Sequence, residues 1–393
     1  MLKEQIDAVF PGKDKKDLKD KVYDALFEPN LTLDEPIYKY LKESIIDISV
    51  LLKALEGITL EIDLKERIKR LFYVDHDLYL PNELGKIFVN SEKIALFIGA
   101  GVSKLLKVPL WDELANIAID CLREGGYINY LEKQKLLMET SPKQKLTIFH
   151  DMLHDKSKLQ KFYSDRLCGE GAGVENNPYD KLIELDSLLG YRGLKITTNL
   201  DNEWEKAWKG YKNISRPSSD APAIANPAAS AFPDYEIKYD KLSGATELNQ
   251  KYLYKIHGTV EDISSAIITT RQYIEAYSRA GGLHAFLTKV FEEYTVLFVG
   301  SGIQEFELLE HCFEKKQKKH YALVGAFTGE EHLFRVKKKY YETLNIHPLL
   351  FYRDYDDYDR LLLVLDTWNK EIKSRRTTQY YDEQKVLDGV ING

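Results

Sequence analysis

The stretch KIALFIGAGVSKLLKVPLW, residues 93–111, contains the clearest structural signal in the sequence. Its apolar run IALFI at 94–98 is typical of a buried strand, and the residues after Gly101 are typical of a helix. Gly99 and Gly101 leave the backbone without side chains where the strand passes into the helix. The stretch therefore predicts a strand, a turn and a helix, which is a building unit of α/β folds.

A turn of this kind can bind phosphate, because main-chain amides lie at the positive N-terminal end of the helix. The dinucleotide-binding pattern G-x-G-x-x-G is incomplete here, since Lys104 occupies the position of the third glycine. A Gly-x-Gly pair alone is a weak indication. Nucleotide binding is one hypothesis at this point and needs support from other parts of the chain.

Short apolar runs of the same character recur after the first one. They lie at residues 193–198, 252–257, 295–300, 320–326 and 347–352. Helical patterns separate most of these runs, and this alternation indicates a mostly parallel sheet with helices on both faces. The expected fold class is thus α/β.

The chain divides into three parts by pattern. Residues 1–85 have apolar positions at helical spacing and are expected to form an N-terminal helical layer, which serves either as a packing extension or in oligomerisation and partner docking. Residues 86–370 are expected to form the α/β domain, with a helical insertion at 120–185 and a Pro/Ala-rich loop at 216–234 that is either a lid or binding loop or a disordered segment. Residues 371–393 form a C-terminal tail.

Composition and charge exclude several classes of protein. The chain has 393 residues and a net charge of −7, with basic residues spread along it, so direct nucleic-acid binding is not expected. No segment approaches the ~20 apolar residues of a membrane span, and the N-terminus lacks the apolar run of a signal peptide. The expected location is cytoplasmic.

The sequence also gives little indication of a metal site. Its three cysteines, Cys121, Cys168 and Cys312, lie far apart and form no Cys-x-x-Cys pair. His150 and His154 have the i, i+4 spacing of zinc ligands but lack the glutamate of H-E-x-x-H and a nearby third ligand. We interpret them as part of a solvated helix face, and no metal is expected.

Polar residues or glycines lie at the carboxyl ends of three further predicted strands. Asn199 and Asp201 come after the strand at 193–198, His257 ends the strand at 252–257, and Gly300 ends the strand at 295–300. The carboxyl ends of parallel strands are where such sheets bind ligands. Asn199 and Asp201 could instead form a turn or helix cap, and His257 could be a buried core residue, but together the strand ends favour a site.

Four motifs in this order resemble the sirtuin-like domains of bacterial anti-phage defence proteins. The motifs are GAGVS at 99–103, TTNLD at 197–201, IHG at 256–258 and VGSG at 299–302, and the likeness covers roughly residues 86–370. The resemblance implies a Rossmann-like domain that binds NAD. It does not cover the N-terminal helical layer.

The resemblance also implies roles for individual residues. The pyrophosphate would be held by Gly99, Ala100, Gly101 and Ser103. Asn199 would contact the nicotinamide ribose or an attacking water, Asp201 the carboxamide, and His257 would be the base. Gly300 and Ser301 would line the adenosine side.

Two departures from the deacylating sirtuins direct the functional hypothesis. The four-cysteine zinc module between the second and later strands is missing, and after GAGVS only the proline of the Gly-Ile-Pro-Asp-Phe-Arg segment is shared. We therefore expect an NAD glycohydrolase that consumes NAD as substrate without zinc. The alternatives are a non-catalytic module that senses NAD or ADP-ribose and, less favoured, a protein deacylase. The resemblance implies a HerA-type ATPase encoded alongside as partner, and the apolar faces of the N-terminal helical layer lead us to expect a homo-oligomer.

Overall fold

The computed structural model describes residues 80–90, 92–169, 177–214, 235–239, 242–278, 282–302, 318–327, 330–353 and 358–392. The predicted N-terminal layer lies outside these ranges except for residues 80–85, and the Pro/Ala-rich loop at 216–234 lies outside them entirely. The last helix spans residues 359–392 and so includes most of the predicted C-terminal tail at 371–393.

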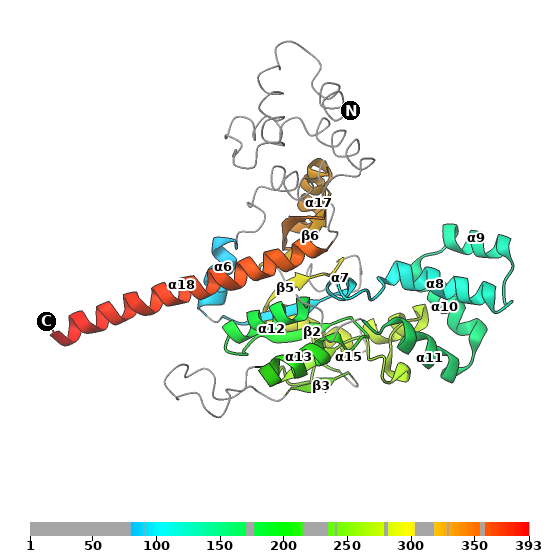
Figure 1. Cartoon of the computed structure of the whole chain (residues 1–393), viewed down its shortest axis with the longest axis horizontal. Coiled ribbons are helices and arrows are strands. Elements are labelled where there is room, and N and C mark those ends of the chain that lie inside the picture. Colours follow the sequence, from blue (N-terminus) through cyan, green and yellow to red (C-terminus); the bar gives the residue numbers. More distant parts are fainter. Residues whose placement is uncertain are drawn as a thin grey trace, which may run out of the picture.

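Seven parallel strands form one sheet in the order β3-β4-β2-β1-β5-β6-β7. The strands are β1 Ile94–Ile98, β2 Leu194–Thr197, β3 Glu236–Lys238, β4 Tyr252–Lys255, β5 Thr295–Val299, β6 His320–Ala326 and β7 Ile346–Tyr352. Helices cover both faces of this sheet (Figure 1). The predicted α/β fold with a mostly parallel sheet is confirmed.

Strand β1 is the centre of the sheet because it pairs with β2 on one side and with β5 on the other. All five of its residues are fully buried. A strand that is buried on both faces has no side chain facing the solvent, so its sequence is a continuous apolar run. The strand β3 gave no such signal, because it is a three-residue edge strand, Glu-Ile-Lys, with two exposed positions.

One face of the sheet is covered by α6 Asn82–Val89, α12 Pro178–Leu188, α13 Glu203–Ile214 and the long α18 Asp359–Asn392. Helix α18 packs against α12 and α6 (Figure 1), and Lys181 Nζ lies 2.5 Å from Asp366 Oδ1 across the α12–α18 contact. Helix α12 begins where its sequence directs it to: Asn177 caps the helix through Tyr179 N, and Pro178 fills the first turn.

The opposite face is covered by α14 Thr270–Tyr277, α15 Gly282–Glu293 and α17 Glu331–Thr343. A short 3-10 helix, η4 Ile263–Ser265, precedes α14. Phe286, Leu287 and Val290 of α15 are fully buried against the sheet. The same strands therefore present side chains to two separate apolar layers.

The segment between β1 and β2 is helical, as the sequence predicts, but its helices begin before residue 120. After the short α7 Ala100–Lys104 come α8 Trp111–Glu124, α9 Tyr130–Glu139, α10 Pro142–Leu153 and α11 Lys156–Arg166. Helices α8 to α11 share their own apolar core and extend to one end of the molecule (Figure 1). Helix α12 belongs instead to the sheet layer.

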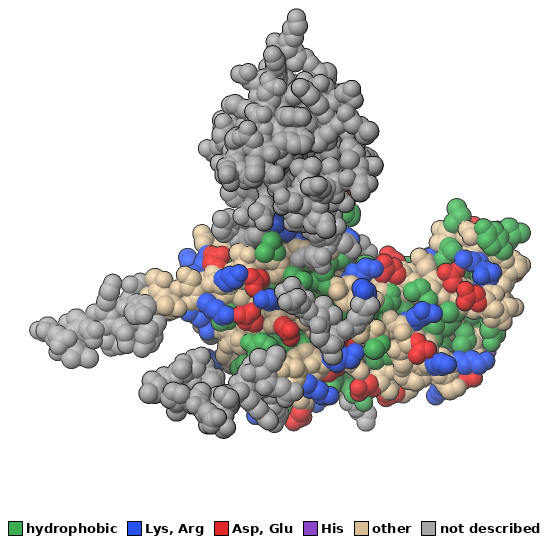
Figure 2. Space-filling model, viewed as in Figure 1, with side chains coloured by type: hydrophobic (Ala, Val, Ile, Leu, Met, Phe, Trp, Pro, Cys, Tyr) green, Lys and Arg blue, Asp and Glu red, His purple; other side chains and the backbone are tan. Residues whose placement is uncertain are grey.

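Two features of the helical insertion are the environment of His150, which differs from the expected one, and an exposed apolar area on α9. His150 lies half-buried with Nε2 2.9 Å from Tyr163 Oη, and burial lowers the pKa of His150 to about 4, so the interpretation as a solvated face is wrong for this residue. Tyr130, Leu131 and Met138 of α9 are exposed at the tip of the insertion, where Figure 2 shows hydrophobic side chains on the surface.

Among the described helices, none combines the length and the apolar character needed to cross a bilayer. Helix α18 has the length, with 34 residues, but charged side chains occur along it.

Candidate functional site

The candidate residues lie near β1, where the order in which strands are added to the sheet reverses. From β1 the chain builds the sheet toward β2 and β4, and it later returns to add β5, β6 and β7 on the other side of β1. The crevice at the carboxyl ends of strands beside such a switch point is the usual ligand site of an open parallel sheet. Gly99, Asn199 and Gly300 follow three of the strands that end there.

The turns after β1 and β5 contact each other directly. Gly99 N donates to Val299 O at 2.9 Å, and Gly101 N donates to Gly300 O at 2.8 Å. A Cβ atom on Gly99 would lie 2.6 Å from Gly300 O and 2.6 Å from Ser301 Cα. Gly300 has a φ of +65°, and a Cβ atom there would lie 2.5 Å from Val102 N.

This contact corrects the explanation of the glycines given by sequence alone. The amides of Gly99 and Gly101 do not lie open for a phosphate in this structure, because the turn after β5 occupies them. The close approach of the two backbones is by itself a sufficient reason for glycine at these positions, because a side chain would not fit. The roles of Gly99, Ala100, Gly101 and Ser103 at the pyrophosphate, and of Gly300 and Ser301 on the adenosine side, stay predictions.

A buried polar cluster lies beside these turns. Ser103 Oγ donates to Asp201 Oδ2 at 2.7 Å and lies 2.6 Å from Tyr179 Oη. Asn199 Nδ2 lies 3.0 Å from Ser103 Oγ, 3.1 Å from Tyr179 Oη and 3.1 Å from Gly99 O. The structure thus brings together Ser103, Asn199 and Asp201, which the sequence singled out from two distant segments.

Asn199 is the member of this cluster with an unused acceptor. Its side chain is buried, its amide nitrogen faces three acceptors, and its Oδ1 has no hydrogen-bond partner among the described residues. Buried polar atoms without partners are rare in folded proteins and often mark a place where a water or ligand binds. Asn199 also lines a small pocket.

The pocket is narrow and mostly apolar. Its volume is about 20 Å³, which is room for about one water molecule. It is lined by Ala100, Val108, Pro109, Trp111, Leu114, Leu167, Asn199, Leu200 and Asp201. The polar groups come from the strand ends, whereas Trp111, Leu114 and Leu167 come from the helical insertion and the residue after α11.

Asp201 is a buried carboxyl with an unusual acidity. Burial raises its pKa to about 6, while the nearby Lys255 ammonium and the Ser103 hydroxyl oppose that rise. Glu203 N also donates to Asp201 Oδ1 at 3.1 Å. Near neutral pH the group is therefore mostly a carboxylate held in a poorly solvated position, where its charge acts strongly on a neighbouring cation.

His257 takes a different place. Its ring is fully buried, with Nε2 2.7 Å from Tyr277 Oη and Nδ1 3.5 Å from Tyr273 Oη. Both tyrosines lie on α14, on the opposite face of the sheet from Tyr179. Burial lowers the pKa of His257 to about 3, so the ring is neutral at pH 7. Its role as the base stays a prediction.

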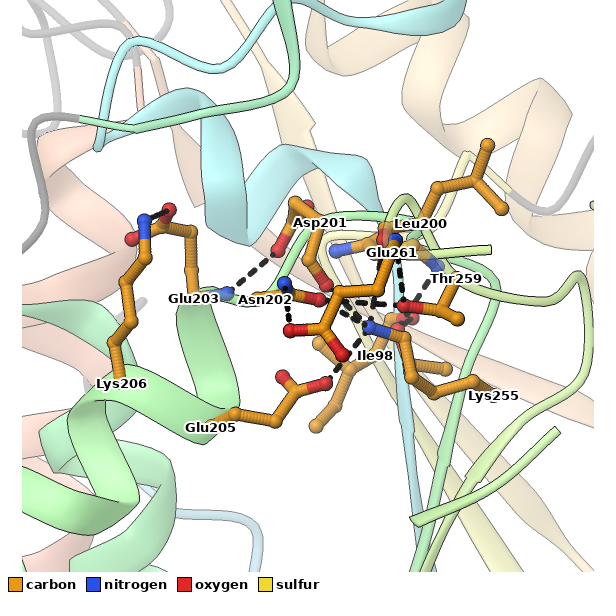
Figure 3. Close-up of polar contacts among 12 residues, drawn as sticks. Ile98, Leu200, Asp201, Asn202, Glu203, Glu205, Lys206, Lys255, Thr259 and Glu261 are labelled. Atoms are coloured by element: carbon orange, nitrogen blue, oxygen red, sulfur yellow. Dashed lines mark hydrogen bonds and ion pairs between the residues drawn. The ribbon is translucent and has the colours of Figure 1, made fainter. Parts of the chain in front are cut away.

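The structure adds two residues, Tyr179 and Lys255, that no sequence pattern selected. Tyr179 reaches the cluster from α12, and its pKa is raised well above the ordinary value by burial and by the Asp201 charge. Lys255 reaches the segment after Asn199 from β4 (Figure 3). The Asn177-Pro178 pair before Tyr179 is typical of a helix start and of nothing more, and Lys255 lies in a strand that is otherwise apolar.

Part of the chain that carries this site is similar to a known domain family. Residues 194–349 match the SIR2-like domain family. SIR2-like domains bind NAD. A search of curated proteins found no match to this chain.

The SIR2-like match covers the sheet from β2 to most of β7. It includes Asn199, Asp201, His257, Gly300 and Ser301, and it begins after the turn that carries Gly99 to Ser103. That turn is joined to the matched region by the pairing of β1 with both β2 and β5. The site therefore combines residues inside and outside the match.

The donors and acceptors of the site fit a nicotinamide nucleotide in type. The unpartnered Asn199 Oδ1 can accept from an amide or hydroxyl, and the Asp201 carboxylate can face a cationic ring. Within the described residues, no group of three or more His, Cys, Asp or Glu side chains is arranged to hold a metal ion.

We expect Gly99→Ala to destabilise the protein even without any ligand. The added Cβ would lie 2.6 Å from Gly300 O and would push the two turns apart, at a cost of about 1–3 kcal/mol in the free energy of unfolding. Gly210→Ala in α13 is the matched control, because a Cβ there meets nothing within 4 Å. Urea unfolding that ranks Gly99→Ala equal to Gly210→Ala would contradict the turn contact.

We expect the stability difference between Asp201→Asn and the wild type to depend on pH. The carboxyl pKa is near its ordinary 3.8 when unfolded and about 6 when folded, so wild-type stability from this group falls as pH rises through that interval. From about pH 4.5 to 7.5 the Asn variant should gain roughly 2 kcal/mol relative to the wild type.

Asp155→Asn provides the opposite case for the same measurement. Asp155 caps α11, and its hydrogen bond from Ser157 lowers its pKa. Its Asn variant should lose, and not gain, stability relative to the wild type as pH rises. A difference for Asp201→Asn that stays constant with pH would show that the folded-state pKa of Asp201 is ordinary.

Proposed function

We propose that the protein is an NAD glycohydrolase that releases nicotinamide and ADP-ribose, and that this activity depletes NAD in anti-phage defence. The observation that carries the proposal is that two residues line one pocket at the switch point: Asp201, a buried carboxylate, and Asn199, whose Oδ1 has no hydrogen-bond partner among the described residues. The SIR2-like match supports the NAD-binding part of the proposal.

The reaction breaks the bond between the ribose C1′ and the nicotinamide nitrogen. The bonding electron pair leaves with the ring, which loses its positive charge, and a water oxygen forms the new bond to C1′. The sugar passes through a cationic, oxocarbenium-like state. A poorly solvated carboxylate such as Asp201 stabilises that cation more strongly than water would, and above about pH 6 Asp201 is mostly ionised.

Asn199 would direct the nucleophile. The pocket beside it has room for about one water, and Oδ1 can accept one of that water's hydrogens while an oxygen lone pair faces C1′. The water's proton must then leave. His257 is the candidate acceptor by resemblance, and its neutral ring is bonded to Tyr277, so proton transfer would involve that hydroxyl.

Nicotinamide is larger than the pocket, so binding requires the pocket to widen. The apolar wall from Trp111, Leu114 and Leu167 is the natural part to move, because these residues pack within or beside the helical insertion and not within the sheet. The strand ends are held by the sheet. In this proposal the insertion controls access to the site.

A second function is favoured by one observation. The burial of His257 and its low pKa make it a poor base as placed, which suits a module that senses NAD or ADP-ribose without cleaving it. A protein deacylase is less favoured, because no cysteine lies between Asn199 and Gly300 to form the zinc module of that branch.

The proposal predicts that the wild type releases nicotinamide from NAD and that Asn199→Ala reduces the rate roughly 100-fold or more, since it removes a group that acts on the nucleophile. Chromatographic analysis of the products measures both. Asn90→Ala, at an exposed position after α6, is the matched control and should keep the wild-type rate.

The outcomes separate the two functions. NAD binding measured by calorimetry without nicotinamide release, alone and with the proteins encoded beside this one, would replace the enzyme with the sensor. Release at the wild-type rate by Asn199→Ala would remove Asn199 from the mechanism but leave the reaction.

The proposal also requires control, because continuous NAD hydrolysis would starve the cell. We propose that the chain forms a homo-oligomer and that a HerA-type ATPase encoded alongside regulates it. Light scattering on the full-length protein should give a mass above that of one chain, and adding the ATPase should change the rate of nicotinamide release. A monomer whose rate is unaffected by the ATPase would contradict this part of the proposal.

A further inference from the structure

Lys255 is a fully buried lysine at the carboxyl end of β4. It pairs with Thr197 of β2 in the sheet, so it lies beside the strand that leads to Asn199. A buried ammonium is costly unless several acceptors surround it. Its partners therefore indicate what the charge is used for.

All the acceptors of Lys255 belong to the segment Leu200–Glu205. Its Nζ lies 2.5 Å from Asp201 O, 2.8 Å from Glu205 Oε1, 3.2 Å from Asn202 Oδ1 and 3.4 Å from Leu200 O. Figure 3 shows the side chain reaching from its strand into this group. Since an ammonium has three hydrogens for these four oxygens, Lys255 ties one short segment together at several points.

This segment and the residue before it, Asn199, carry the polar groups of the pocket. Asn199 and Asp201 flank Leu200, whose carbonyl faces Lys255. The Asp201 carboxylate is held on its other side by Ser103 and by Glu203 N. Lys255 thus fixes the backbone of Asp201 while Ser103 fixes its side chain.

We propose that Lys255 is a positioning residue for this site: its ammonium fixes the segment Leu200–Glu205 and so sets where Asn199 and Asp201 face the pocket. The inference rests on the proposed function, since it assigns Lys255 to the same reaction. Lys255 itself is absent from the residues that line the pocket.

The charge of Lys255 gives this role a signature beyond stability. The groups that face Asp201 are Ser103 from α7, Tyr179 from α12, Glu205 from α13 and Lys255 from β4. Of these, Lys255 lowers the pKa of Asp201 and Glu205 raises it. Removing either charge must therefore move the Asp201 titration, and in opposite directions.

The test compares Lys255→Met and Lys255→Arg with Lys145→Met in the full-length protein. Lys145 is also buried, but it donates to Asn116 within the helical insertion. We expect Lys255→Met to lower kcat at least 10-fold with a smaller change in KM, and to move the acid limb of the pH profile to higher pH. Lys255→Arg should recover part of kcat, and Lys145→Met should keep the wild-type profile.

Glu205→Gln keeps the experiment decisive if Lys255→Met does not fold. This variant retains the ammonium and removes its charged partner, so the acid limb should move to lower pH. An unchanged kcat and acid limb in Lys255→Met, or an acid limb in Glu205→Gln that does not move, would overturn the proposal.

A protein that releases no nicotinamide would overturn the proposed function without deciding the role of Lys255. In that case the Asp201 carboxyl is titrated by NMR in the unliganded wild type, Lys255→Met and Glu205→Gln. Shifts of the Asp201 pKa in the two opposite directions support the placement of Lys255, and an unmoved pKa in both variants rejects it.

Discussion

The backbone contact between the turns after β1 and β5 is the constraint on which the site depends. Gly101 N binds Gly300 O, and neither Gly99 nor Gly300 has space for a side chain. Because β1 and β5 are neighbours at the switch point, this contact fixes where α7 begins. The start of α7 in turn directs Ser103 toward Asn199 and Asp201.

Burial is the common physical cause of the unusual groups in this region. It raises the pKa of Asp201, lowers the pKa of His257 and leaves Asn199 Oδ1 away from bulk water. In a poorly solvated interior each hydrogen bond and each charge acts more strongly than at the surface. The hydroxyl of Ser103 and the ammonium of Lys255 offset the cost of burying Asp201.

The fold was predictable because its central strands are buried on both faces. Mostly apolar runs marked β1, β2, β4, β5, β6 and β7, and each run lies where the structure has a strand. The strand β3 was missed, because three residues at an exposed edge show no apolar run. The start of the helical insertion was placed too late for a different reason. Trp111–Glu124 is amphipathic from its first turn, but the sequence does not show whether such a helix packs on the sheet or in the insertion.

The sequence by itself determined which residue types follow the strand ends, because a parallel sheet places all of those ends along one edge. That was sufficient to select Asn199 and Asp201, and the resemblance of GAGVS to sirtuin-like domains added Ser103. The structure brings these three residues together. Only the tertiary structure decided that Tyr179 and Lys255 join them and that His257 faces α14. These contacts link positions separated by 20 to 54 residues, and they depend on the packing of helices and strands, which local sequence patterns do not encode.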